Sequence, residues 1–188
     1  MSEDEGPLRA FVALELSEGL RGRILELQSE LSKRAPGVRW IARGAVHLTL
    51  RFLGQASPKQ LALMGEALKT ASAACPATKA LVTGVGTFPE RGHPRVLWLG
   101  LRVAPEVMAL QVACESAAVK AGFAPENRAF LPHLTLGRWR DRAPRPTLPG
   151  VDLGSTVLDT LTLFRSDLGR GGAIYTPLQR FTLAAGEA

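Results

Sequence analysis

Two of the three histidines in this 188-residue chain open the same tetrapeptide, HLTL, at residues 47–50 and again at residues 133–136. The alternation of polar and apolar residues in both copies predicts half-buried β-strands. Successive side chains of a strand point to opposite faces, so His47 and Thr49 share a face, as do His133 and Thr135 in the second copy. Each copy therefore presents an imidazole beside a hydroxyl on a strand with an apolar back.

Two imidazoles that meet at one phosphorus atom can hydrolyse a phosphodiester. A neutral ring takes the proton of the attacking water and a protonated ring delivers one to the leaving oxygen, tasks that suit histidine because its ordinary pKa lies near neutrality. The hydroxyls of Thr49 and Thr135 can donate to the non-bridging phosphate oxygens, where charge grows in the transition state. This scheme predicts a bell-shaped pH dependence and needs no metal ion or other cofactor.

A metal site is the alternative use of two histidines, but it requires a third or fourth ligand. Asp141 and Asp159 are the nearest acidic candidates, and nothing in the sequence places them beside either motif. We therefore expect no metal site. The third histidine, His93, lies in an RGHP turn and is expected at the surface.

The chain is basic, with a net charge of +6 and a sequence pI of about 10.0. Five of its 23 basic residues are lysine and the other 18 are arginine, the residue that binds phosphate with a two-pronged donor fork. This charge suits an anionic partner such as RNA. A compositional bias that also enriches Ala, Gly and Leu explains it equally well.

The N-terminus is acidic and lacks the pattern of a signal peptide, and no stretch approaches the length of a membrane span. Cys75 and Cys114 are too few for a disulfide framework, and both fall in predicted helices. We expect free buried thiols, a cytoplasmic location and no contact with a membrane.

The motif strands must be positioned by the elements around them. Capping serines at Ser17 and Ser57, Pro58 in a first turn and Gly122 at a C-cap predict helices over residues 17–34, 57–75 and 105–122. Apolar patterns predict strands over residues 8–16, 38–41, 46–53, 81–85, 95–101, 130–139, 157–165 and 174–183. Residues 140–150, rich in Arg and Pro, are expected to form an exposed loop.

A helix precedes each motif strand at a similar distance, which indicates a duplicated unit. Strands interleaved with helices, with connections too short for a regular parallel sheet, favour an α+β fold. We expect two pseudo-symmetric lobes of mainly antiparallel sheet, with outer helices, around a central cleft. Residues 1–188 are expected to form a single two-lobed domain.

The chain resembles the two-histidine (2H) phosphoesterases, and most closely their branch of RNA 2′,3′-cyclic phosphodiesterases, also described as 2′-5′ RNA ligases. The resemblance covers nearly the whole chain in order. It includes RAFVA at 9–13, VRW at 38–40, HLTLRFLG at 47–54, RVLW at 95–98, PHLTLGR at 132–138, and LFRS at 163–166 with Tyr175 downstream.

This resemblance implies hydrolysis of RNA 2′,3′-cyclic phosphate ends to 2′-phosphomonoesters, with O3′ as the leaving group, and the reverse 2′-5′ ligation as a related activity. It assigns the general acid to His47 and the general base to His133, with Thr49 and Thr135 holding the phosphate. The family's basic residue five positions after the second histidine falls on Arg138. The implied partner is an RNA or oligonucleotide end, without an obligate protein partner, and we expect a monomer.

Strict alternation places Arg138 with Leu134 and Leu136, away from His133, unless a bulge near Gly137 returns it to the histidine face. Alternation without a bulge places Arg51 on the same face as His47, which makes Arg51 the second candidate phosphate ligand. The same alternation places Phe52 on the opposite face with Leu48.

Several other residues have two interpretations. Arg140, Arg142 and Arg145 can line an RNA path with Trp139 as a stacking platform, or simply belong to a solvated loop. Trp40 and Trp98 are expected in the core. At the level of function, the alternatives are a phosphodiesterase for a small cyclic nucleotide, and a module that binds RNA ends without catalysis.

Overall fold

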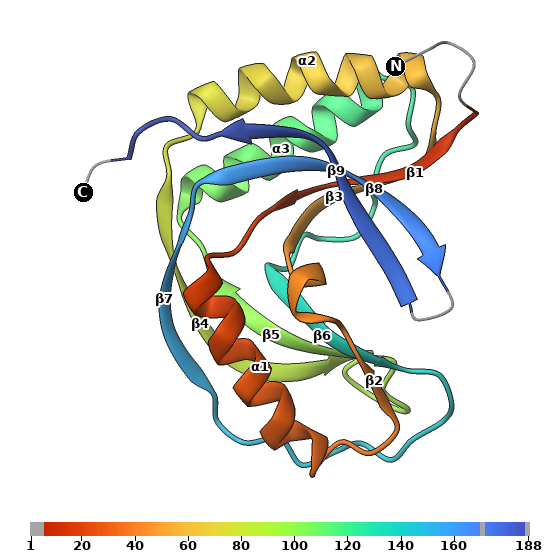
Figure 1. Ribbon diagram of the computed structural model, residues 1–188, viewed down its shortest axis with the longest axis vertical. Helices are drawn as coiled ribbons and strands as arrows, with labels where there is room; N and C mark the ends of the chain where they lie inside the picture. The colour runs from red at the N-terminus through yellow and green to blue at the C-terminus, as the bar shows by residue number, and fades with distance from the viewer. Residues whose placement is uncertain (1–5, 170–171, 187–188) are drawn as a thin grey trace.

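In the computed structural model, which describes residues 6–169 and 172–186, one antiparallel sheet of nine strands curls on itself and is packed by three α-helices (Figure 1). The strand order is β7-β4-β5-β6-β3-β1-β8-β9, and β2 pairs with β6. The strands are β1 (Leu8–Leu14), β2 (Val38–Trp40), β3 (Leu48–Ala56), β4 (Thr78–Phe88), β5 (Val96–Arg102), β6 (His133–Trp139), β7 (Asp152–Leu158), β8 (Thr160–Gly169) and β9 (Gly172–Thr182). The helices are α1 (Glu18–Ser32), α2 (Pro58–Ala74) and α3 (Pro105–Lys120), with the short 3₁₀ helix η1 (Arg43–Ala45).

The predicted two-lobed α+β fold is confirmed. One lobe contains β1, β3, β8 and β9, and α2 and α3 pack against it; the other contains β2 and β4–β7, with α1 packed against β7. The motif strands β3 and β6 lie side by side where the lobes meet. The helix that precedes one motif strand packs against the lobe of the other motif strand. α1 precedes β3 but packs against β7, in the lobe of β6. α3 precedes β6 but packs against β3.

The helices begin and end where their caps predict. The Ser17 hydroxyl accepts a hydrogen bond from the Leu20 amide at 3.3 Å. Ser57 and Gln60 form a reciprocal capping box ahead of Pro58. Gly122, just beyond α3, has a φ of +89°, a conformation that favours glycine at a helix end.

The prediction of one continuous strand over residues 157–165 is wrong, because these residues belong to two strands. The chain leaves β7 at Leu158, passes through Asp159 alone and enters β8 at Thr160. Because β7 pairs with β4 and β8 pairs with β1, this one residue joins opposite lobes, and the sheet must curl to allow it. Figure 1 shows β7 rising along one side and continuing into β8 across the top.

A buried ion pair ties the first motif strand to α3. Arg51 is only 8% exposed, and its Nε lies 2.6 Å from Oε2 of Glu115, close enough for charge attraction although the two are not aligned as a hydrogen bond. The guanidinium also donates to the carbonyls of Phe52 and Ala124. Arg51 therefore anchors β3 to the helix side of the sheet.

Replacing Glu115 with Ala should leave the Arg51 charge buried without its partner. We expect the free energy of unfolding to fall by about 2–4 kcal/mol in urea denaturation. The control is Glu18→Gln, which removes an exposed carboxylate near Arg43 and should cost less than about 1 kcal/mol. Equal losses in the two variants would contradict the role given to the buried pair.

Candidate active site

The two HLTL motifs form one cluster because their strands are neighbours. Leu48 of β3 lies directly across from Leu134 of β6 in an antiparallel pair, and both leucines are fully buried. Continuing that register by one residue in each direction sets His47 across from Thr135 and Thr49 across from His133. Side chains directly opposite one another on antiparallel strands have Cβ atoms about 5 Å apart. The four polar residues thus occupy one patch of the sheet face opposite the leucines, which we call the site face.

A bulge in β3 overturns two of the sequence predictions. Ala13 of β1 pairs with Thr49, but the preceding residue of β1 pairs with Arg51, so Leu50 is an extra residue. Beyond this bulge the alternation is reversed. Arg51 points to the helix side rather than toward His47, and Phe52 returns to the site face, where its ring lies 5.9 Å from that of Phe11.

A second bulge, in β6, brings Arg138 to the site face. Trp98 of β5 pairs with Thr135 and Val96 pairs with Arg138, so the four residues 135–138 of β6 lie opposite the three residues 96–98 of β5. The bulge that was expected near Gly137 is therefore confirmed. Glycine is required there because an added Cβ would lie 2.3 Å from the Val38 side chain of β2.

His47 lies in an aromatic enclosure. Its ring stacks on Phe11 at 4.6 Å between centroids, meets the ring of Tyr175 edge-on at 5.2 Å, and lies 6.0 Å from Phe164. Burial in this enclosure lowers the pKa of His47 to about 4, although a hydrogen bond with the backbone of Ala45 favours the protonated form. In the free protein at neutral pH, His47 is therefore uncharged.

His133 is held in a matching way. Its Nδ1 lies 2.7 Å from the carbonyl oxygen of Leu131, two residues earlier, as Ala45 is two residues before His47. A carbonyl can only accept, so Nδ1 carries the proton and Nε2 is left for proton transfer. The ring also meets Phe88 edge-on at 5.2 Å. Burial lowers the pKa of His133, and the nearby charge of Arg138 lowers it further.

A carboxylate faces His47 from β1, and the sequence analysis missed it. Leu14 pairs with Leu48, so the same register sets Glu15 across from His47. Its Oε1 accepts hydrogen bonds from Thr162 at 2.6 Å and from Arg180 at 2.7 Å. The negative charge of Glu15 favours protonation of His47. The alternation of residues 8–16 could have predicted which face of its strand carries Glu15. It could not have predicted that Glu15 lies beside His47, because that depends on the pairing of β1 with β3.

Trp98 does not lie in the core, contrary to prediction. Its indole is half-buried on the site face, with its ring 5.3 Å from that of Phe88, which also contacts His133. The ring packs against Gly86 and Gly100: an added Cβ would lie 2.3 Å from the ring at Gly86 and 3.4 Å from it at Gly100. Glycines on two neighbouring strands thus make room for this side chain, and the sequence does not reveal that pairing.

The remaining candidates lie elsewhere. Trp139 cannot serve as a stacking platform because it is buried, and its indole donates to the Pro36 carbonyl at 3.0 Å. Arg145 hydrogen-bonds Thr87 and the carbonyls of Pro89 and Gly92. His93 is exposed, with Nδ1 3.2 Å from the carbonyl oxygen of Ala143.

Other core predictions hold. Trp40 packs against the core. Cys75 and Cys114 are free, buried thiols, and burial raises the pKa of Cys114 to about 12.

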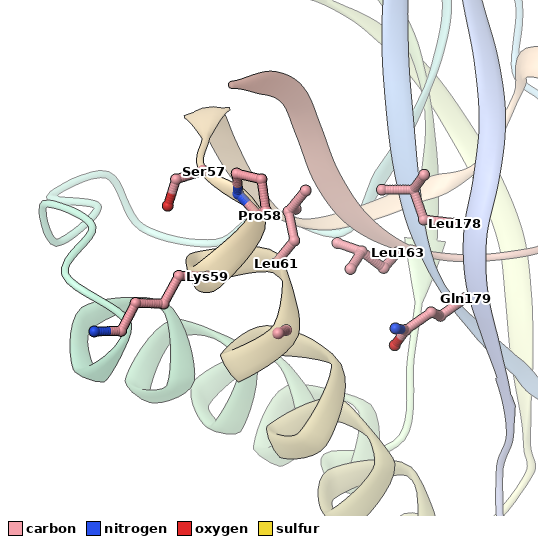
Figure 2. A pocket seen from close by; sticks show the side chains of 8 residues that line it. Ser57, Pro58, Lys59, Leu61, Leu163, Leu178 and Gln179 are labelled. Atoms are coloured by element: carbon pink, nitrogen blue, oxygen red, sulfur yellow. The ribbon is translucent and has the colours of Figure 1, made fainter. Parts of the chain in front are cut away.

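A hollow of about 640 Å³ lies away from the histidines. It lies between the first turns of α2 and the strands β8 and β9 (Figure 2), on the side of the sheet to which Leu163 points and away from Phe164. Its lining is mostly apolar and consists of Ser57, Pro58, Lys59, Leu61, Ala62, Leu163, Leu178 and Gln179. It is therefore separate from the site face.

Within residues 6–169 and 172–186, no three side chains of His, Cys, Asp or Glu gather in a way that could hold a metal ion. None of the helices in that same part of the chain has the length and apolar character needed to cross a bilayer.

Comparison of the sequence with known proteins identifies a family. The family LigT like Phosphoesterase matches residues 14–98. The RNA 2′,3′-cyclic phosphodiesterase of Methanothermobacter thermautotrophicus is 31% identical, over 94% of this chain and 99% of the relative. That of Escherichia coli is 32% identical, over 94% of this chain and 97% of the relative.

The crystal structure of E. coli LigT complexed with 3′-AMP has the same fold, with a TM-score of 0.82 at 29% identity, over 94% of this chain and 98% of that one. Sequence and fold agree over nearly the full length of these proteins. The chain therefore belongs to the LigT-like phosphoesterase family of two-histidine (2H) enzymes.

Proposed function

We propose that the protein hydrolyses RNA 2′,3′-cyclic phosphate ends to 2′-phosphomonoesters by general acid–base catalysis without a metal ion. The observation that carries this proposal is the pairing of Leu48 with Leu134, which sets two imidazoles and two hydroxyls together on the site face. The names of the relatives from M. thermautotrophicus and E. coli support the substrate class, and the basic net charge of +6 suits RNA.

In this mechanism His133 is the general base. Its lowered pKa keeps it neutral near pH 7, and its Nε2 takes a proton from the water that attacks phosphorus. His47 is the general acid and protonates O3′ as the P–O3′ bond breaks. It needs a proton that it lacks in the free protein, and the negative charges of the substrate phosphate and of Glu15 favour that protonation.

The phosphate is held by neutral and charged donors. The hydroxyls of Thr49 and Thr135 donate to its non-bridging oxygens, and the guanidinium of Arg138 balances the charge that grows on them. Arg138 is suited to this role because it forms no salt bridge with any residue in the described part of the chain.

The whole chain acts as one two-lobed unit in this proposal, because each lobe supplies one motif strand. If a 5′-hydroxyl replaces water as the nucleophile, the same proton transfers join two RNA ends through a 2′-5′ linkage.

Replacing either catalytic imidazole tests the proposal directly. With a 2′,3′-cyclic nucleotide in excess chelator, His47→Ala and His133→Ala should each lower kcat by about 10²–10⁴-fold, and the double variant should fall little further. Chromatography should identify the 2′-phosphomonoester as the product of the wild type.

Circular dichroism should show that these variants remain folded. A wild-type enzyme that binds such ends without turnover would be a binding module, and one inactivated by chelator would contradict the metal-free mechanism. Near-normal turnover by either variant would contradict the two-histidine scheme.

The pH dependence follows from the two lowered pKa values. Activity requires one proton on the pair of imidazoles, and that form is most populated between the two pKa values. Since His47 titrates at about 4 and His133 below its ordinary 6.5, kcat/KM should be bell-shaped with its maximum below pH 6.5. The profile of kcat should lie at higher pH because bound phosphate raises both pKa values. A kcat/KM maximum above pH 7 would contradict this account.

A further inference from the structure

A buried arginine of α1 fixes the backbone around His47. Arg21 is only 8% exposed, and its guanidinium donates to three main-chain carbonyls. Nε donates to Leu16 at 3.1 Å, and Nη1 donates to Arg43 at 3.2 Å and to Val46 at 3.0 Å. Leu16 follows β1, whereas the other two residues lie in the segment that leads into β3. We call Arg21 with these three carbonyls the guanidinium clamp.

The guanidinium clamp begins where the pairing of β1 with β3 ends. The last pair of that ladder is Leu14 with Leu48, and the same register, continued by two residues, sets Leu16 across from Val46. All four side chains are buried in one core, as this register requires. The carbonyls of Leu16 and Val46 both accept from the clamp, so the guanidinium joins the two strand ends beyond the ladder. His47 is therefore held by the ladder on one side and by the clamp on the other.

The guanidinium clamp also fixes the hydrogen-bond partner of the imidazole. The ring of His47 bonds to the backbone of Ala45, and because this bond favours the protonated ring, the carbonyl of Ala45 is the acceptor. Ala45 closes the short helix η1 and lies between Arg43 and Val46, whose carbonyls both accept from Nη1 of Arg21. The peptide groups around Ala45 are thus fixed, and with them the direction in which its carbonyl points.

The charge of Arg21 does not help His47 to carry a proton. Burial is the main cause of the lowered pKa of His47, and the positive charge of Arg21 lowers that pKa further, while the carboxylate of Glu15 acts in the opposite direction. What Arg21 can contribute to a general acid is therefore geometric, and it comes from the fork of donors rather than from the charge.

We propose that Arg21 is a positioning residue for proton transfer: its clamp directs the carbonyl of Ala45, which holds Nδ1 of His47 and leaves Nε2 for the leaving oxygen. This inference rests on the proposed function, in which His47 is the general acid. His133 shows the same arrangement, with Nδ1 2.7 Å from the carbonyl oxygen of Leu131, two residues earlier. Because the guanidinium of Arg21 is engaged by carbonyls, it acts on the reaction through His47.

The first test removes the fork and keeps the charge. With a 2′,3′-cyclic nucleotide as substrate, Arg21→Lys should lower kcat by about 10- to 100-fold, because a small displacement of a catalytic group is costly, and should leave KM within about twofold of wild type. Arg21→Gln, which also lacks the fork, should behave alike. The matched control is Arg23→Gln on the same helix: Arg23 donates to the carbonyl of Ser155 at 3.1 Å, in β7, and its loss should leave kcat unchanged.

A double-mutant cycle shows whether Arg21 acts through His47. In the His47→Ala background, Arg21→Lys should lower kcat by less than about twofold, because the ring that the clamp positions is absent. A purely structural role would give the same further loss in both backgrounds. The inference is overturned if Arg21→Lys keeps the kcat of the wild type, or if its loss is undiminished without the imidazole.

The tautomer of His47 provides a readout that does not depend on turnover. The chain has three histidines, so ¹⁵N NMR can resolve their rings, and the spectrum of His47→Ala identifies the resonances of interest. At neutral pH the wild type should carry the ring proton of His47 on Nδ1, and Arg21→Lys should show a mixture of the two tautomers. A wild type with the proton on Nε2 would overturn the inference, as would a loss of kcat without a change in the tautomer.

Gln28→Met is the control for stability in the NMR experiment. Gln28 is a buried side chain of α1 that donates to the carbonyls of Ile41 and Leu136, each at 3.0 Å. Its loss should lower the free energy of unfolding and leave the tautomer of His47 unchanged.

The outcomes separate this inference from the proposed function. If the wild type hydrolyses no cyclic phosphate but the tautomer of His47 changes in Arg21→Lys, the hydrolytic proposal fails and the positioning role stands. If hydrolysis is as proposed but Arg21→Lys alters neither kcat nor the tautomer, the positioning role alone fails.

Discussion

The pairing of one leucine with another, Leu48 with Leu134, is the constraint on which this site depends. It joins two strands that are 86 positions apart in the chain, and it fixes which of their side chains lie across from each other. Because both leucines are fully buried, a slip by one residue would bring polar side chains into the core and apolar ones to the surface. The energy of the hydrophobic core thus enforces the register of the polar groups on the opposite face.

The surroundings of the two imidazoles determine how readily each ring is protonated. Phe11, Tyr175 and Phe164 shield the half-buried ring of His47 from part of the solvent and make its charged form costly. The groups that oppose this effect are few: the backbone of Ala45 and the carboxylate of Glu15. Because burial lowers the pKa of both histidines, the negative charge of a bound anion has a large influence on their protonation.

Much of the site could be predicted from sequence because it rests on local rules. Alternation placed His47 with Thr49, capping residues marked the helix ends, and the conflict at Arg138 pointed to a bulge near Gly137. The failures came from features without a local signature. The bulge at Leu50 carries no glycine, so Arg51 and Phe52 were assigned to the wrong faces. Trp98 lies on the site face because glycines of two strands meet beneath it, and Glu15 lies beside His47 only through pairing between β1 and β3.

The single residue Asp159 between β7 and β8 bears on how the enzyme can move. Hinge motions need a few residues free to absorb large changes in φ and ψ, and strands held in ladders on either side offer almost none. Its carbonyl also accepts a hydrogen bond from Leu183 at 2.8 Å. At this end the two lobes are joined without a flexible segment, which limits how far a hinge between β7 and β8 can change the spacing of the two imidazole rings.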